Sequence, residues 1–534
     1  MAEGPYASRF SVLGHSKVLP RERQAGLAAK QEGCCRPVEL YTGQAAFVTL
    51  DAASSVLDLR KYKGTHKGCP YVGTHDRDGM SMTQRQPNIL LFVTDDHGQW
   101  ASGPYGNREV ETPNLDRLAA SGVVMENAFT PTPVCSAARA SLLTGLTPSQ
   151  HGVHDYIAMA FDRGPWLAGE RTLPQLLQET GYRTGLAGKW HAGNEDEPAP
   201  GFDSWFSVGS AYPLRHEGKR DFCNQGRMEA MCGYTDEIIA EQATRFAEAD
   251  DQRPFFLLVG LTATHGPWSG HSERLVSLYR DATFGDIPVG ESYQFGKQVL
   301  ESLSVDRGRE REAQAQYYAA VSHVDEIIGR LLAAVDGVGK LGETLVVYTS
   351  DHGLNCGHHG IWGKGNGTRP LNMVEESIGV PLILKWPGVL PAGMRCGELV
   401  DHLDLFQTLA GSGQGQLPPD ADYAGRSMLP ILVEPDGGGS WRDVQFGEYG
   451  TVRMARTKRY KLVQRHPSGP DELFDLETDP RECRNLIDRS SHQALRSELS
   501  LLIESHFGRY SRPGKSGTLG AGLPQHNMTE AWRT

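Results

Sequence analysis

The sequence has 534 residues and a formal net charge of −12. This length exceeds what a single hydrophobic core usually holds, so more than one domain is expected, and the negative charge argues against general binding to nucleic acid or to anionic membranes. The nine cysteines are scattered and include the adjacent pair Cys34 and Cys35, a pattern that does not form a disulfide framework.

The apolar segments are too short to cross a bilayer. The longest, residues 255–261, falls far below the length of a transmembrane helix. Residues 1–30 contain no apolar core of a secretory signal. The sequence therefore predicts no membrane span, and a cytoplasmic location follows as the default.

Residues 1–85 mix glycine with charged and polar residues and show little periodicity. We interpret them as a disordered extension, or as sequence upstream of the start that the cell uses, and assign them no function.

Three continuous apolar runs follow, at residues 88–94, 254–261 and 344–350. Such runs are typical of strands buried on both faces of a parallel sheet. Each run is followed closely by acids or histidines, namely Asp95, Asp96, His265, Asp351 and His352. Ligands of open α/β sheets bind at the carboxyl ends of the strands, so this convergence predicts an active site there.

Between these runs, apolar residues recur at the spacing of a helix, which predicts helices at residues 113–122, 173–179, 235–248 and 310–335. The alternation of helices with apolar strands predicts an α/β fold with a large, mostly parallel central sheet flanked by helices. We assign this catalytic domain to residues 86–425.

The pattern changes after glycine-rich breaks, and residues 426–510 are expected to form a small α+β subdomain. It would contain an antiparallel sheet and one helix, from residues 444–449, 451–457, 460–463 and 492–507. Residues 511–534 are rich in glycine and polar residues and are predicted to be a loose tail.

Cys135 lies in the stretch Pro133-Val-Cys-Ser-Ala-Ala-Arg139. Two interpretations of this cysteine are open on local sequence alone. It could be a small buried hydrophobe, as most free cysteines are. Alternatively, it could be a nucleophile near a helix start, where the pKa of a thiol is lowered.

The charged candidates are open to two interpretations as well. Asp95 and Asp96 could cap the next helix, or they could join Asp351 and His352 as ligands of a divalent cation. Lys189 and His191, two residues apart on an extended segment, would face the same side. They could supply a point charge and a proton acceptor, or they could be ordinary surface and half-buried residues.

A resemblance to a known family bears on these alternatives. Cys135-Ser-Ala-Ala-Arg139, followed by Thr144-Gly145, resembles the sulfatase signature. Gly-Lys189-Trp-His191 resembles the Gly-Lys-Trp-His motif of that family, and His265 and Lys364 match its sulfate-contacting histidine and second lysine. The resemblance extends over residues 87–507, including the C-terminal Asp-Leu-x-x-Asp-Pro-x-Glu-x-x-Asn-Leu pattern at 475–486.

The resemblance implies a sulfatase of the alkaline-phosphatase-like fold that cleaves a small-molecule or carbohydrate sulfate ester. A maturation enzyme would convert Cys135 to formylglycine, whose hydrate attacks sulfur. A divalent metal, usually Ca²⁺ with Mn²⁺ or Mg²⁺ as alternatives, would be held by Asp95, Asp96, Cys135, Asp351 and His352. The family's other catalytic positions correspond here to Arg139, Lys189, His191, His265 and Lys364, and Asp351 is also its candidate for activating the hydrate.

Two positions depart from the commonest family pattern. Ala137 stands where proline is usual, which leaves the route of cysteine conversion open. His352 stands where many arylsulfatases have asparagine. Histidine there also occurs in iduronate-type sulfatases, choline sulfatases and phosphonate monoester hydrolases. A phosphonate or phosphodiester hydrolase, and a non-catalytic sulfated-glycan-binding relative with unconverted Cys135, are therefore the alternatives.

Overall fold

The computed structural model describes residues 86–158, 164, 166–209, 217–288, 293–294, 297–298, 309–433 and 441–523. The predicted extension, residues 1–85, and the last part of the predicted tail, residues 524–534, lie outside the described residues.

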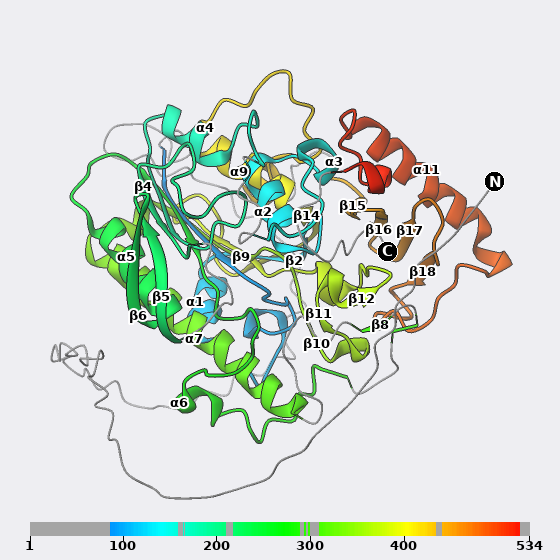
Figure 1. The fold of residues 1–534 in the computed structure, drawn as a ribbon, viewed down its shortest axis with the longest axis horizontal. Coiled ribbons are helices and arrows are strands. Elements are labelled where there is room, and N and C mark those ends of the chain that lie inside the picture. Colours follow the sequence, from blue (N-terminus) through cyan, green and yellow to red (C-terminus); the bar gives the residue numbers. More distant parts are fainter. Residues whose placement is uncertain are drawn as a thin grey trace, which may run out of the picture. The chain divides into compact units, whose positions relative to one another are not determined.

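A ten-stranded sheet forms the centre of the described protein (Figure 1). Its strands are β1 (Asn88–Thr94), β2 (Val123–Phe129), β3 (Arg183–Gly188), β4 (Ser204–Ser207), β5 (Glu217–Asn224), β6 (Arg227–Tyr234), β7 (Phe255–Gly260), β9 (Thr344–Ser350), β13 (Leu382–Lys385) and β14 (Met394–Asp401). Their order is β14-β2-β13-β9-β1-β7-β3-β4-β5-β6. The five strands from β9 to β4 are parallel, and so are β14 and β2, whereas β13, β5 and β6 pair in antiparallel fashion.

β1 lies inside the parallel region, between β9 and β7, and every residue of it is buried. It pairs with β7 and β9, so that Leu90 lies opposite Leu257 and Val346. Successive side chains of a strand point to opposite faces, and Leu91 and Phe92 accordingly belong to two different hydrophobic clusters. The strand is continuously apolar because both faces are covered, as the sequence predicted.

Helices form a layer on each face of the sheet (Figure 1). One layer contains α1 (Pro113–Ala120), α5 (Thr235–Glu248) and α7 (Glu310–Gly337), and the other contains α2 (Cys135–Thr144), α4 (Leu173–Glu179) and α9 (His402–Ser412). The four predicted helices are therefore confirmed as α1, α4, α5 and α7. Shorter helices are α3 (Pro148–His151), α6 (Glu273–Val276), α8 (Glu375–Ile378) and α10 (Leu429–Val433).

The C-terminal part contains a four-stranded antiparallel sheet and one long helix, as predicted. These elements are β15 (Val444–Tyr449), β16 (Val452–Thr457), β17 (Tyr460–Arg465), β18 (Glu472–Asp475) and α11 (Gln493–Arg509). α11 covers one face of this sheet. Met454 of β16 and Val463 of β17 pack in one hydrophobic cluster with Phe129 and Val134, which lie at the end of β2 and before α2. Two further two-stranded ladders pair β10 (Asn355–Cys356) with β11 (Trp362–Gly363) and β8 (Lys297–Gln298) with β12 (Thr368–Arg369).

The segment after α11 is bonded to the catalytic domain in its described part, up to residue 523. The Thr147 hydroxyl donates to the Tyr510 carbonyl at 2.7 Å, and the Arg512 amide donates to the Ser149 carbonyl at 3.0 Å. These bonds hold the first half of the predicted tail beside α3.

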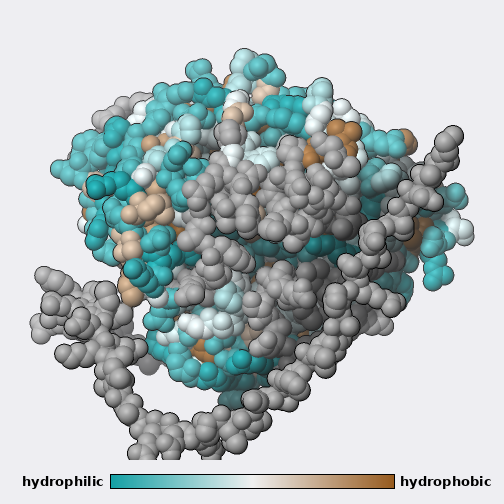
Figure 2. All heavy atoms as spheres, viewed as in Figure 1, coloured by the Kyte–Doolittle hydropathy of each residue, from teal (hydrophilic) through white to brown (hydrophobic). Residues whose placement is uncertain are grey.

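The surface in view is mainly hydrophilic, with hydrophobic residues scattered singly (Figure 2). Isolated apolar residues are normal on a globular protein. Among the described residues, no helix has the length and hydrophobicity needed to span a membrane.

Candidate active site

The acidic side of the site is formed where β1 and β9 end. Thr94 pairs with Ser350 in the parallel ladder, so the residues that follow each strand become neighbours. The Asp96 amide donates to Asp351 Oδ1 at 3.3 Å. Asp95, Asp96, Asp351 and His352 are all fully buried, as the convergence of strand ends in the sequence led us to expect.

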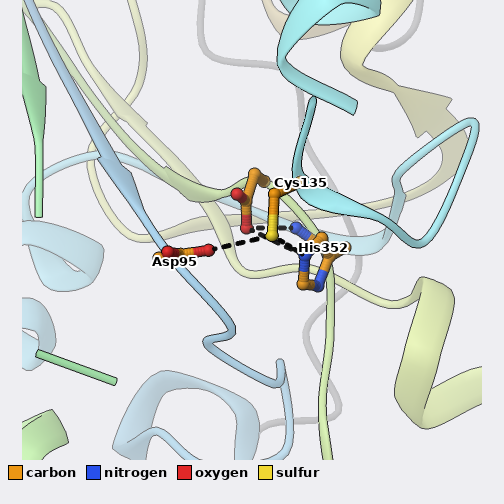
Figure 3. A group of neighbouring side chains, drawn as sticks. Asp95, Cys135 and His352 are labelled. Atoms are coloured by element: carbon orange, nitrogen blue, oxygen red, sulfur yellow. Dashed lines mark hydrogen bonds and ion pairs between the residues drawn. The ribbon is translucent and has the colours of Figure 1, made fainter. Parts of the chain in front are cut away.

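Cys135 is the first residue of α2, and its side chain lies among these groups (Figure 3). Its sulfur is 2.8 Å from Lys364 Nζ, 3.3 Å from His352 Nε2 and 3.4 Å from Asp95 Oδ1. The residue as a whole is 2% exposed. Cys135 is therefore buried, as one of the two interpretations expects, but it lies among charged groups instead of apolar ones.

Cationic side chains face the acids from other elements. Lys189, directly after β3, forms an ion pair with Asp95. Lys364, directly after β11, has its Nζ 2.6 Å from Asp96 Oδ1. His265, in the turn after β7, has its Nε2 3.9 Å from Asp96 Oδ2. The site therefore alternates positive and negative groups in a buried space where their mutual attraction is strong.

Arg139 connects two parts of this arrangement. It lies on α2, one turn after Cys135, with its Nε 2.9 Å from Asp351 Oδ2. Its Nη1 donates to the Lys189 carbonyl at 3.0 Å. The guanidinium, which is always charged and offers several donors in a fixed plane, thereby holds the β9 end and the β3 end together.

His191 is held by a backbone carbonyl of another loop and by a carboxylate of its own loop. Its Nε2 lies 3.0 Å from the Ile157 carbonyl, and its amide donates to Glu195 Oε1 at 2.8 Å. A carbonyl only accepts hydrogen bonds, so Nε2 carries the hydrogen and Nδ1 keeps its lone pair. Burial and the charge of Lys189 lower the pKa of His191.

The charges change the protonation of the central groups. Burial alone would raise the pKa of the Cys135 thiol, but Lys189, Lys364 and His352 outweigh it and hold that pKa well below its ordinary value. Burial opposes the charge of His352, but the Asp351 carboxylate outweighs it and raises the pKa of His352 to about 9. The site stabilises an anion at the position of Cys135.

Two overlapping groups of side chains could hold a metal ion within the described residues. One consists of Asp95, Cys135, Asp351 and His352, and the other of Asp95, Asp96, Cys135 and His265. In each group the ligand atoms all lie within 4.8 Å of one another. Asp96 Oδ2 is buried and has no hydrogen-bond partner among the described residues, so this acceptor is available to a cation.

All the predicted site residues are therefore brought together, and further residues that the sequence did not indicate contact them. Ile157 orients His191 through its carbonyl, Glu195 binds the backbone at His191, and Tyr317 donates to the Asp96 carbonyl at 3.0 Å. No motif marks these residues. Their roles depend on backbone groups and on long-range packing, which leave no local pattern in a sequence.

Comparison with known proteins agrees with this geometry. A family model described as Sulfatase matches residues 87–413, and one described as N-sulphoglucosamine sulphohydrolase, C-terminal, matches residues 357–506. An N-acetylglucosamine-6-O-sulfatase of Bacteroides thetaiotaomicron is 26% identical over 80% of this chain and 87% of its own length. Human arylsulfatase A is 30% identical over 76% of this chain and 84% of its own.

The fold also has counterparts among solved structures. One, described as a complex with its substrate D-glucosamine-2-N,6-O-disulfate, has a TM-score of 0.71 at 25% identity, covering 80% of this chain and 98% of the other. The phosphonate monoester hydrolase of Agrobacterium radiobacter has a TM-score of 0.64 at 22% identity, covering 79% and 96%, and shares the fold. With the buried charged site and the α/β sandwich of the alkaline-phosphatase-like type, these matches show that the chain belongs to the sulfatase family of sulfuric ester hydrolases.

Proposed function

We propose that this sulfatase hydrolyses a sulfated carbohydrate, with formylglycine at position 135 and a bound Ca²⁺ ion. The observation that carries the proposal is the environment of the Cys135 sulfur. It lies within 4.8 Å of ligand atoms of Asp95, Asp351 and His352 and 2.8 Å from Lys364 Nζ. A cysteine that served packing alone would be surrounded by apolar groups instead.

The donor set fits a hard divalent cation. Three carboxylates supply oxygen ligands, which Ca²⁺ and Mg²⁺ prefer, and His352 adds a nitrogen that Mn²⁺ also accepts. The buried Asp96 Oδ2, without a hydrogen-bond partner among the described residues, is an acceptor that a cation would satisfy. Such an ion supplies positive charge that polarises the sulfate and lowers the pKa of a bound hydroxyl.

Formylglycine supplies a hydrated aldehyde, one hydroxyl of which is the nucleophile toward sulfur. The residues of this chain prepare its surroundings. Lys189 and Lys364 neutralise charge on the sulfate oxygens, because both ammonium groups are buried and keep their protons. His265 adds a third positive group, since Asp96 and Asp95 outweigh its burial and raise the pKa of this histidine.

His191 is the proton acceptor of the proposed mechanism. Its Nε2 is committed to the Ile157 carbonyl, while its ring lies close enough to Cys135 to be affected by the charge of that side chain. A lowered pKa keeps the ring neutral near pH 7, so Nδ1 can take a proton from a hydroxyl at position 135. Arg139 keeps Asp351 and the Lys189 backbone in register around this group.

Similarity to relatives supports a sulfated amino sugar as the substrate. One relative is named an N-acetylglucosamine-6-O-sulfatase, and a similar structure is described as holding a glucosamine disulfate. The matching C-terminal family is named for an N-sulphoglucosamine sulphohydrolase. We therefore expect activity on a sulfated glucosamine to exceed activity on a simple aryl sulfate.

Mass spectrometry of the tryptic peptide of residues 118–139 tests the nucleophile. Protein from its natural host should carry an aldehyde in place of the Cys135 thiol. A thiol in every molecule would contradict the proposal and favour a binding protein. Paired kinetics on an aryl sulfate and an aryl phosphonate test the reaction, and preference for the phosphonate would favour a phosphonate hydrolase at the same site.

A further inference from the structure

Asp96 adopts a backbone conformation that a side chain disfavours. Its φ angle is +64°, in the left-handed region that residues other than glycine seldom occupy. Its carboxylate is fully buried, with Oδ1 3.2 Å from His352 Nε2. Strained backbone of this kind persists only where surrounding groups impose it, and it is concentrated at functional sites.

The hydroxyl of Tyr317 lies beside this strained turn. It donates to the Asp96 carbonyl at 3.0 Å and accepts from the Gly98 amide at 3.0 Å. One hydroxyl thus connects the carbonyl of the strained residue with the amide two residues later. The phenol is fully buried, and its ring packs against Trp100 and Trp268 with centroid distances of 5.7 and 6.0 Å.

The other peptide groups of the turn are bonded to residues at strand ends. The Asp96 amide donates to Asp351 Oδ1 at 3.3 Å, and the His97 amide donates to the Ser350 hydroxyl at 2.9 Å. Tyr317 comes from α7 instead, so it braces the turn from the helical layer. Together these bonds fix the direction in which the Asp96 carboxylate leaves the backbone.

We propose that Tyr317 is a positioning residue for the metal centre. Its hydroxyl holds Asp96 in the left-handed conformation, which directs that carboxylate toward the ligand atoms of Asp95, Cys135 and His265. Tyr317 touches neither metal nor substrate, and the inference rests on the metal centre of the proposed function. Loss of a hydrogen-bond partner that orients a metal ligand typically weakens metal affinity by roughly 10–100-fold.

Calorimetric titration of the metal-free protein with Ca²⁺ tests this role in Tyr317→Phe and Tyr318→Phe. Tyr318 is the next residue of α7 and is equally buried. Its hydroxyl accepts from Asn107 Nδ2 at 3.0 Å, so its loss removes a comparable bond away from Asp96. We expect the Kd for Ca²⁺ to rise at least about tenfold in Tyr317→Phe and less than about twofold in Tyr318→Phe.

Thermal unfolding with and without Ca²⁺ provides a second readout that also verifies folding. The two metal-free variants should unfold at similar temperatures, while the stabilisation by Ca²⁺ should be smaller in Tyr317→Phe. This comparison requires only enough folded protein for an unfolding curve.

Each result has a definite meaning. Wild-type affinity in Tyr317→Phe, or equal weakening in both variants, would overturn the positioning role and leave the proposed metal centre intact. A wild-type protein that binds none of Ca²⁺, Mg²⁺ and Mn²⁺ would overturn the metal centre itself, and this inference with it.

Discussion

At the scale of residues, the site is a set of buried charges that balance one another. Lys364 contacts both the Cys135 sulfur and Asp96. Burial alone would lower the pKa of this lysine, but Asp96 and Cys135 outweigh it and raise that pKa well above its ordinary value. The ammonium group is therefore charged at neutral pH, and it is placed to meet an anionic substrate.

Lys364→Ala should lower kcat/KM for a sulfate ester by roughly 10²–10³-fold, because one preorganised positive group is removed from a water-poor site. Lys458→Ala is the matched control. That lysine is exposed and pairs with Glu398 at 3.3 Å, so its loss should leave kcat/KM unchanged. A Lys364 variant with near-normal kcat/KM would show that the other positively charged side chains of the site suffice for the reaction.

At the scale of elements, two contacts from outside the central sheet hold the loops that carry catalytic groups. His359, in the turn between β10 and β11, pairs with Glu376 of α8, Nε2 to Oε2, at 3.0 Å. Lys364 follows β11 directly. This ion pair thus fixes the turn that precedes the lysine proposed to contact the sulfate.

Because of this pair, the free energy of unfolding depends on pH over the range that the pKa values of its two members set. Burial would raise the pKa of Glu376, but the bond from His359 and the nearby histidine charges lower it from 4.5 to about 2. The contribution of the Glu376 carboxylate to the free energy of unfolding is therefore lost as pH falls from about 5 to about 2. Burial would lower the pKa of His359, but Glu376 raises it above 6.5, so that contribution is complete below pH 6.5 and is lost as pH rises through the raised pKa.

Glu376→Gln should therefore reduce the free energy of unfolding by about 1–3 kcal/mol near pH 5.5, with smaller losses below pH 3 and at alkaline pH. Unfolding curves of the variant and the wild type at several pH values measure this difference. A difference that stays constant with pH would mean that the pair does not titrate as described.

Tyr449, the last residue of β15, makes the second contact. Its hydroxyl donates to Asp155 Oδ1 at 2.7 Å, two residues before the Ile157 carbonyl that orients His191. Its ring also lies against the loop of Lys364, because a Cβ at Gly365 would be 2.9 Å from Tyr449 Cδ1.

Tyr449→Phe should lower kcat about tenfold with a smaller change in KM, because the orientation of His191 is loosened while the sulfate-binding cations remain. Tyr460→Phe, in the same sheet, is the control, and steady-state kinetics should show it to be unaffected. A Tyr449 variant in which KM alone rises would place the effect in substrate binding instead.

At the scale of the whole molecule, the end of the chain returns to the catalytic domain. A Cβ at Gly517 would lie 2.0 Å from the Gly450 carbonyl and 3.1 Å from His154 Cε1, and the Gly517 amide donates to the Ser149 hydroxyl at 3.2 Å. The segment after α11 is therefore in close contact with the loop after β15 and with residues 147–154.

Gly517→Ala should lower the melting temperature, since the added methyl group meets backbone that has no room to move; overpacking of this kind costs about 1–3 kcal/mol. Gly508→Ala, in α11 with open space around it, should have no effect or stabilise by up to about 1 kcal/mol through helix propensity. Differential scanning calorimetry distinguishes the two. Equal melting temperatures would show that the structure accommodates the added methyl group without loss of stability.

The sequence predicted the parts of this molecule whose cause is local. Both bounds of β1 and of β9 were predicted correctly, because a strand that is buried on both faces forms a continuous apolar run in the sequence. Asp95, Asp96, Asp351 and His352 could be grouped because the ends of parallel strands meet at one edge. The insertion of β13 between β2 and β9, and the bonds from Tyr317 and Tyr449 to the site, could not be predicted. The pairing of β13 with β2 and the bonds from the two tyrosines join residues more than 200 positions apart, and all these contacts depend on how finished elements pack.

The burial of Cys135 also constrains whether this residue is converted before or after the chain folds. A cysteine that is 2% exposed and is surrounded by side chains from the loops after β1, β9 and β11 offers little approach to a second protein. Those neighbours assemble only when the central sheet has formed, and long-range sheets form late in folding. Conversion of Cys135, as proposed, would therefore take place on the nascent or unfolded chain, and the rate of folding would set the time that a maturation enzyme has to act.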